Sequence, residues 1–248
     1  MYRFFVGSDH INDKEIFING PDHNHIKNVL RIRPGEEISV QIPGDGNEYR
    51  CALERFEDDR AILKLLFIKE DNVELPNRIY LFQGLPKSDK MELIIQKAVE
   101  LGVYEIIPVS MKRSVVKLDE KKKESKRTRY NAISEAAAKQ AKRGIIPKIT
   151  NVMSFKEAVE YAKETDIKLL PYELHDNNTF EDTRKLLENI KRGESVSVFI
   201  GPEGGFEDDE VELAKSSGFK EITLGKRILR TETAGMTVLS WLVYLLEG

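Results

Sequence analysis

The stretch VSVFIGPEGGFEDDEVELAKSSG, residues 196–218, decides how this chain is interpreted. It predicts a hydrophobic strand, then a turn that contains three glycines and a proline, then a helix whose first turn is acidic. Gly201, Gly204 and Gly205 have no Cβ atom, so the backbone around them can approach a ligand closely. A strand, a glycine-rich turn and a helix in this order indicate a ligand-binding loop of an α/β domain.

The glycine-rich turn matches neither common nucleotide-binding signature. No Gly-Lys-Ser/Thr follows, as in a P-loop, and the spacing differs from Gly-x-Gly-x-x-Gly. The carboxylates of Glu203, Glu207, Asp208 and Asp209 would repel phosphates, so the turn favours a neutral or cationic ligand such as an adenosine that bears a sulfonium. A purely structural tight turn is the alternative.

A second glycine-punctuated segment follows, KEITLGKRILRTETAG, residues 220–235, which leads from a strand into the last helix. A Rossmann domain would place its glycine-rich turn after its first strand, whereas here both loops lie near the C-terminus. Loops at the carboxyl ends of neighbouring parallel strands converge on one crevice. We therefore expect the two loops to share one binding site.

Upstream of these loops, strands and helices alternate from about residue 78, which is typical of a largely parallel sheet. Ser88 is the expected N-cap of a helix that ends near Gly102, and Ser154 with Glu157 forms a predicted capping box. A long basic helix is expected over residues 120–142. The predicted strands of this part are residues 79–84, 104–109, 167–173, 195–201 and 220–225.

The first seventy residues or so predict a small β-barrel of short strands, with one helix that starts near Pro21. The predicted strands are residues 2–6, 15–19, 37–42, 49–56 and 61–68. Residues 71–78, which include Pro76, are the expected linker to the α/β domain.

Composition excludes several classes of protein. The 248 residues are 40% hydrophobic and 33% charged, and the single Cys51 excludes disulfide scaffolds and Cys-rich zinc modules. No apolar run is long enough to span a bilayer, so we expect a cytoplasmic protein with no membrane partner. No metal partner is expected either, because His23 and His25 are interpreted as ordinary polar residues. The net charge is −3, yet residues 110–148 are strongly basic, which suits RNA phosphates. A solvated helix face is the alternative for that basic segment.

Several motifs together resemble the ribosomal RNA small subunit methyltransferase E family. They are IGPEGGF (200–206), LGKRILRTETA (224–234), KSDKMELIIQKAVELGV (87–103) with RSVV (113–116), RFF (3–5) and HIKNVLRIRPG (25–35). The likeness spans nearly the whole chain and implies an α/β fold. The implied C-terminal domain, residues 73–248, is of the SPOUT class, with a parallel sheet and a deep trefoil knot at about 196–240. A small PUA-like β-barrel that binds RNA is implied for residues 1–72.

The resemblance also implies a function: methylation of N3 of one uridine in 16S rRNA of the small ribosomal subunit, with S-adenosylmethionine (SAM) as donor, by a homodimer. The last helix has more apolar surface than one buried face requires, which agrees with dimerisation; a buried helix of a monomer is the alternative. A non-catalytic, RNA-binding ribosome assembly factor is the first alternative. A nicotinamide-dependent oxidoreductase is the second, which the missing dinucleotide fingerprint disfavours.

Residue roles follow from the chemistry and from the matched motifs. Arg230 is the expected catalytic cation that stabilises the uracil anion, and Glu232 is a candidate base. The implied cofactor-binding residues are Leu170, Tyr172, Ile200, Gly201, Glu203, Gly204, Gly205, Leu224, Gly225, Ile228, Leu229, Thr231 and Ala234. Core packing is the alternative for the aliphatic residues, and N-capping of the last helix for Thr231. The expected RNA-binding residues are Arg3, Arg31, Arg33, Arg113, Gln140 and Arg143. Relatives usually have an acid where this chain has Lys139, which weakens any role assigned to that helix.

Overall fold

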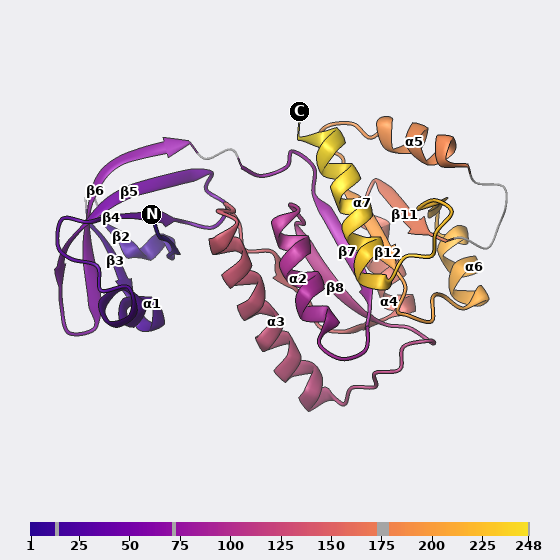
Figure 1. Cartoon of the computed structure of the whole chain (residues 1–248), viewed down its shortest axis with the longest axis horizontal. Helices are drawn as coiled ribbons and strands as arrows, with labels where there is room; N and C mark the ends of the chain where they lie inside the picture. The colour runs from indigo at the N-terminus through magenta and orange to yellow at the C-terminus, as the bar shows by residue number, and fades with distance from the viewer. Residues whose placement is uncertain (13–14, 71–72, 173–178, 248) are drawn as a thin grey trace. The chain divides into compact units, whose positions relative to one another are not determined.

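The computed structural model describes residues 1–12, 15–70, 73–172 and 179–247. The chain forms two compact units (Figure 1). The first comprises Met1–Glu74 together with Ala138–Ile146, and the second comprises Leu75–Ala137 together with Pro147–Gly248. The sequence did not predict that residues 138–146, at the end of the long basic helix, pack with the first unit.

The first unit is built on a six-stranded sheet with the order β1-β4-β5-β6-β3-β2. All pairs are antiparallel except β1 with β4. Alternate strand residues such as Ile16, Ile18, Ile38 and Val40 point into one buried core, as the period of a strand requires. The strands are β1 (Arg3–Phe5), β2 (Ile11–Asn12), β3 (Glu15–Asn19), β4 (Glu37–Gln41), β5 (Asn47–Phe56) and β6 (Arg60–Glu70). The predicted strands of this region are therefore confirmed.

Short helical turns complete the first unit. The turn η1 (Ser8–His10) precedes β2, and α1 (Gly20–Asn24) continues directly into the π-helical turn η2 (His25–Val29). The predicted helix near Pro21 is present, with Pro21 in its first turn, where the missing backbone N–H costs nothing.

The second unit is built on a parallel sheet with the order β10-β8-β7-β12-β11-β13, in which β9 also pairs with β8. The five predicted strands are present, and the two-residue strands β9 and β10 are additional. The strands are β7 (Ile79–Gly84), β8 (Glu105–Ser110), β9 (Lys148–Ile149), β10 (Met153–Ser154), β11 (Ile167–Pro171), β12 (Val196–Ile200) and β13 (Lys220–Ile222).

Helices cover both faces of this sheet (Figure 1). Phe82 stacks on Phe199 with ring centroids 4.2 Å apart, in a core shared with α4 and α6. The neighbouring Leu81 and Gln83 point to the opposite face, where they lie beside Gly235 of α7, and α7 packs on α2. The helices are α2 (Lys90–Glu100), α3 (Glu120–Gln140), α4 (Phe155–Tyr161) with the turn η3 (Ala162–Glu164), α5 (Phe180–Glu188), α6 (Asp208–Ser216) and α7 (Thr231–Leu246).

The N-terminal caps of the helices were predicted with mixed success. The capping box of Ser154 and Glu157 is confirmed. Ser88 is not the N-cap of α2, because its φ of 56° is left-handed and the N-cap is Asp89, one residue later. Thr231 is not the N-cap of α7 either, because Arg230 holds that extended position and Thr231 is the first helical residue.

Candidate active site

A cavity of about 570 Å³ lies at the carboxyl ends of the parallel strands of the second unit. Its walls come from Pro171 and Tyr172 at the end of β11, the glycine-rich turn after β12, and the loop between β13 and α7. Ligands of open α/β sheets bind at this edge, because the loops that follow neighbouring strands meet there. The two glycine-punctuated loops of the sequence therefore share one site, as expected.

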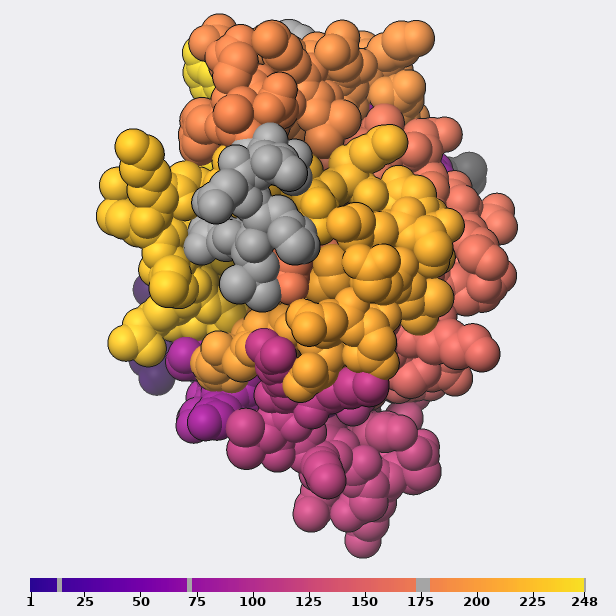
Figure 2. Space-filling model, turned by 90° about the vertical axis from the view of Figure 1, so that its right-hand side faces the viewer, coloured from indigo at the N-terminus to yellow at the C-terminus, as the bar shows by residue number. Residues whose placement is uncertain are grey.

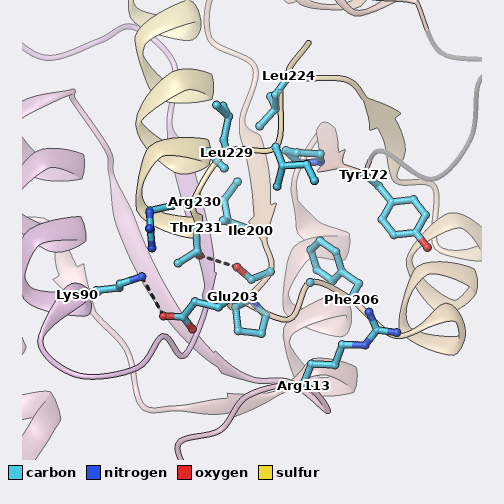
Figure 3. Close-up of a pocket in the computed structure, with 16 residues that line it drawn as sticks. Lys90, Arg113, Tyr172, Ile200, Glu203, Phe206, Leu224, Leu229, Arg230 and Thr231 are labelled. Carbon is cyan, nitrogen blue, oxygen red and sulfur yellow. Dashed lines mark hydrogen bonds and ion pairs between the residues drawn. The ribbon is translucent and has the colours of Figure 1, made fainter. Parts of the chain in front are cut away.

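The cavity has an apolar centre between two polar sides (Figure 3). Ile200, Leu224 and Leu229 form the apolar centre. Lys90, Arg230 and Glu203 lie toward one side, and Tyr172, Phe206 and Arg113 toward the other. Most of the predicted cofactor-binding residues line this cavity: Tyr172, Ile200, Gly201, Glu203, Gly205, Leu224, Ile228, Leu229, Thr231 and Ala234.

Three predicted cofactor-binding residues do not line it. Leu170 is fully buried in the core formed with α4 and α6. The carbonyl of Gly204 accepts a hydrogen bond from Arg113, and the N–H of Gly225 donates to the Thr223 hydroxyl at 3.2 Å. The cofactor role of these three residues stays a prediction.

Close backbone approach shapes the glycine-rich turn. A Cβ atom at Gly84, the last residue of β7, would lie 2.6 Å from the Pro202 nitrogen. A Cβ atom at Gly201 would lie 3.1 Å from the Gly205 Cα, so the turn folds back on itself. The φ of Gly205 is 71°, which favours glycine. Glycine at Gly84 and Gly205 is therefore a geometric requirement of the pocket wall.

A chain of hydrogen bonds joins the two pocket loops to the sheet. The Thr231 hydroxyl donates to the Gly201 carbonyl at 2.6 Å (Figure 3). The buried Gln83 amide donates to the Thr231 hydroxyl at 2.8 Å and to the Gly84 carbonyl at 2.9 Å. Thr231 thus has a structural role, and the role of Gln83 was missed because nothing in the local pattern of β7 distinguishes it.

One lysine joins two carboxylates at the side of the cavity. The Lys90 Nζ lies 3.2 Å from Glu203 Oε1 and 3.3 Å from Glu232 Oε2. Hydrogen bonding to Glu203 first, and then to Glu232, raises the pKa of Lys90. Burial acts to raise the pKa of Glu203, but hydrogen bonds from backbone N–H groups, including that of Lys87, and from Lys90 lower it overall. Sequence reasoning missed Lys90, although a lysine in the first turn of a helix is itself unusual.

A pair of basic residues fastens the β8–α3 segment to the start of α6. The Arg113 Nε donates to Glu207 at 2.9 Å, and its Nη1 donates to the Gly204 carbonyl at 3.0 Å. Lys112 pairs with Asp209. Figure 2 shows the two segments side by side on the surface, the first in magenta and the second in orange-yellow. Arg113, a predicted RNA-binding residue, is thus bound to the pocket wall.

The other predicted RNA-binding residues lie in the first unit and divide into two groups. Arg31, Arg33 and Gln140 are exposed. Arg3 and Arg143 are not, because their side chains are only 7% and 5% exposed. An RNA-binding role for any of them stays a prediction.

The two buried arginines hold residues 138–146 in place. Arg143 Nε donates to the Glu74 carboxylate at 2.9 Å, and Arg3 Nη1 donates to the Lys142 carbonyl at 2.7 Å. Lys139 pairs with Asp22 at 3.0 Å, which gives this departure from the family pattern a structural role.

Within the part of the chain that the structure describes, no helix combines the length and apolarity that crossing a membrane needs. Across residues 1–12, 15–70, 73–172 and 179–247, no three His, Cys, Asp or Glu side chains gather in a metal-binding arrangement.

Comparisons with known proteins agree with this architecture. The model of an RNA methyltransferase domain matches residues 73–243, and that of an RNA methyltransferase PUA domain matches residues 18–66. The Ribosomal RNA small subunit methyltransferase E of Bacillus subtilis is 36% identical, over 100% of this chain and 98% of that protein. The protein of the same name from Mesomycoplasma hyopneumoniae is also 36% identical, over 97% of this chain and 98% of its own length.

Two solved structures with SAM bound are similar over nearly the whole chain. The Ribosomal RNA small subunit methyltransferase E of Neisseria gonorrhoeae is 29% identical with a TM-score of 0.85, over 99% of this chain and 98% of that one. A structure from Legionella pneumophila in complex with SAM is 30% identical with a TM-score of 0.85, over 98% and 97% of the two chains. The resemblance seen in the sequence motifs is confirmed, and the chain belongs to the ribosomal RNA small subunit methyltransferase E family.

Proposed function

We propose that this protein methylates N3 of one uridine in the 16S rRNA of the small ribosomal subunit, with SAM as the methyl donor. As a member of its family it is a SAM-dependent rRNA methyltransferase. The finer assignment, to uridine N3, follows from the family resemblance of the motifs. The observation that supports methyl transfer most directly is the cavity between the two glycine-punctuated loops, which has an apolar centre and an acidic residue at its side.

The residues of the cavity fit SAM in chemistry and size. Its volume of about 570 Å³ lies in the range of small-molecule sites. Ile200, Leu224 and Leu229 would hold the adenine, and Glu203 offers negative charge to a ligand that carries a sulfonium and an ammonium. When bound, SAM supplies an electrophilic methyl group. The absence of a Cβ atom at Gly201 and Gly205 lets a ligand approach the main chain of the cavity wall closely.

Proton removal is the step for which the chain must supply catalytic groups. N3 of a uridine is protonated at neutral pH, so it must lose its proton before it can accept a methyl group. Arg230 lines the cavity as the N-cap of α7, where the guanidinium and the helix N-terminus can both stabilise negative charge on a uracil oxygen. Glu232, the second residue of α7, is the proposed acceptor of the N3 proton.

The domain and assembly roles extend the proposal. Residues 1–72 act as the PUA-like RNA-binding domain, and residues 73–248 as the SPOUT domain with a trefoil knot at about 196–240. The position of β12 between β7 and β11, with α7 returning onto α2, supports the knot. The Tyr244 side chain is 87% exposed on α7, which supports dimerisation through that helix. A substrate in the small ribosomal subunit supports a cytoplasmic location for the enzyme.

The test is methyl transfer itself. Small subunits and free 16S rRNA from cells that lack the enzyme are incubated with the protein and isotope-labelled SAM, and the labelled nucleotide is identified by mass mapping. Label on N3 of one uridine is expected. Label on another atom would contradict the N3 assignment. RNA binding without heat from SAM in a calorimetric titration would instead favour the non-catalytic assembly factor.

A further inference from the structure

We infer that the loop between β13 and α7, residues 223–230, also binds the RNA, with Lys226 and Arg227 on phosphates and Ile228 against a base beside the target. This inference rests on the proposed function. Neither Lys226 nor Arg227 was among the residues expected to bind RNA.

Ion pairing separates the basic residues around the cavity into two groups. Lys90, Lys112 and Arg113 are held by Glu203, Asp209 and Glu207 respectively. Within the described ranges, no carboxylate lies at ion-pair distance from Lys226, Arg227 or Arg230. A cation that has no carboxylate partner can contact a phosphate without first breaking an ion pair. These three residues are therefore better suited to contact phosphates than Lys90, Lys112 and Arg113.

The loop brings these cations next to the reacting groups. Leu224, Leu229 and Arg230 belong to the same loop and line the cavity. The φ of Gly225 is 100°, so the chain turns sharply just before Lys226 and Arg227, and both side chains are exposed. Lys226 and Arg227 are only a few residues from Arg230 along the chain. An RNA strand whose phosphates contact them therefore has a base close to the methyl-transfer site.

Ile228 supplies the apolar part of the surface. Ile228 borders the cavity beside Leu229, yet its side chain is 93% exposed, so most of its apolar surface remains open to a ligand outside the cavity. An enzyme that acts on a base must take that base out of the stack, and apolar side chains commonly fill the gap that is left. The flanking cations favour RNA over a second copy of this chain as the partner of Ile228, because they complement the charge of a phosphate backbone.

The first experiment measures the salt dependence of RNA binding. The double variant Lys226→Ala/Arg227→Ala should lower the slope of log affinity against log salt concentration by about 1.4, the value for two lost single-strand phosphate contacts. The probe is 16S rRNA, and SAM affinity measured by calorimetry should stay within about twofold of wild type. A slope equal to that of wild type would overturn the inference.

The matched control is Lys191→Ala/Arg192→Ala. These residues are also one lysine and one arginine, adjacent and exposed, but they precede β12 and so lie at the opposite edge of the parallel sheet. The salt slope of RNA binding by this control variant should equal that of wild type. An equal loss of slope in both double variants would show that the charge effect is non-specific and would overturn the assignment to the loop.

The second experiment separates the apolar contact from the charges. Ile228→Ala should lower kcat/KM for RNA by about tenfold with no change of salt slope, and Ile228→Leu should restore it. A parallel loss of SAM affinity would show that Ile228, which borders the cavity, contacts the cofactor instead of a base of the RNA. If the loop variants change the sedimentation of the protein while the salt slope stays at the wild-type value, a second copy is the partner and the inference fails.

The wild-type protein distinguishes failure of this inference from failure of the proposed function. Absence of methyl transfer by the wild type would contradict the proposed function. Normal wild-type transfer combined with a wild-type slope in Lys226→Ala/Arg227→Ala would contradict only the role of the loop.

Discussion

Residues 138–146 and the loop at 223–230 both carry basic side chains, but the two segments are held in opposite ways. The first is held by charges: Arg143 pairs with Glu74 and Lys139 with Asp22. The second is held by neutral contacts. The Thr223 N–H donates to the Thr183 hydroxyl, and Thr231, directly after the loop, bonds to the Gly201 carbonyl and to Gln83. A basic segment in a sequence therefore indicates RNA contact only where its charges are not already used to hold the fold.

The largest expected effect concerns Arg230, a cation of the loop at 223–230 that is not held by a described carboxylate. Arg230→Ala should lower kcat by about 10²- to 10³-fold, because it removes a charge that stabilises the uracil anion. SAM affinity should stay within about twofold. Single-turnover methylation and calorimetry measure the two quantities. An equal loss of affinity and rate would show that Arg230 holds the pocket together, and Arg192→Ala is the exposed control that should change neither.

A paired cation should affect stability instead. Arg143→Met removes the cation from the Glu74 carboxylate, which keeps the Gly144 N–H, and should lower the free energy of unfolding of the first unit by about 2 kcal/mol. Arg227→Met should change stability by less than about 0.5 kcal/mol. Urea unfolding measures both. An Arg143→Met variant that is as stable as wild type but binds RNA weakly would show that Arg143 binds RNA. The two segments would then not differ in the role of their cations.

The neutral contacts of the pocket loops can be tested by an isosteric change. Thr231→Val removes both hydrogen bonds of the hydroxyl and should cost about 1–3 kcal/mol in stability. SAM affinity should fall with it, because Gly201 and Thr231 both line the cavity. Thr231→Ser keeps the hydroxyl and should stay close to wild type. Equal behaviour of the two variants would mean that the methyl group, not the hydrogen bonds, holds the loops.

The smallest expected effect is a pH dependence in the first unit. Burial acts to raise the pKa of Glu48, but the Ser39 hydroxyl, Arg3 and Arg50 lower it overall from its ordinary value of 4.5. A lowered folded-state pKa stabilises the fold above the unfolded value, and that stabilisation is lost as the pH falls through the folded one. The stability difference between wild type and Arg3→Met should therefore narrow between about pH 6 and about pH 3. A difference in urea midpoints that does not change with pH would show that the Arg3–Glu48 ion pair is not the cause of the stability difference.

The sequence predicted the parts of the fold that depend on local pattern. The alternating strands of the first unit and the hydrophobic strands before each glycine-rich loop are present, because their side-chain periods are set within a few residues. The convergence of two late loops on one cavity was predicted from strand direction. Ser88 failed as an N-cap because the chain needs a left-handed residue just before α2, which no side-chain pattern reports.

The parts that were missed depend on contacts between distant residues. Lys90 becomes part of the site only because Glu203 and Glu232 reach it from two other loops. Gln83 takes part in the site only through its hydrogen bond to Thr231, which is 148 positions further along the chain. The attachment of residues 138–146 to the first unit depends on Glu74, Asp22 and Arg3. Composition marks such residues as polar but cannot say which partner each one finds.

The hydrogen bonds that join Gln83, Gly201 and Thr231 also set an order of events during synthesis. The residues come from three well-separated points of the chain, and the last belongs to the final helix. A nascent chain that still lacks this helix cannot close the methyl-donor site, however long it waits on the ribosome. The donor can therefore stabilise only a chain that already includes Thr231 and α7, and premature stop codons before Thr231 should yield products that no concentration of donor stabilises.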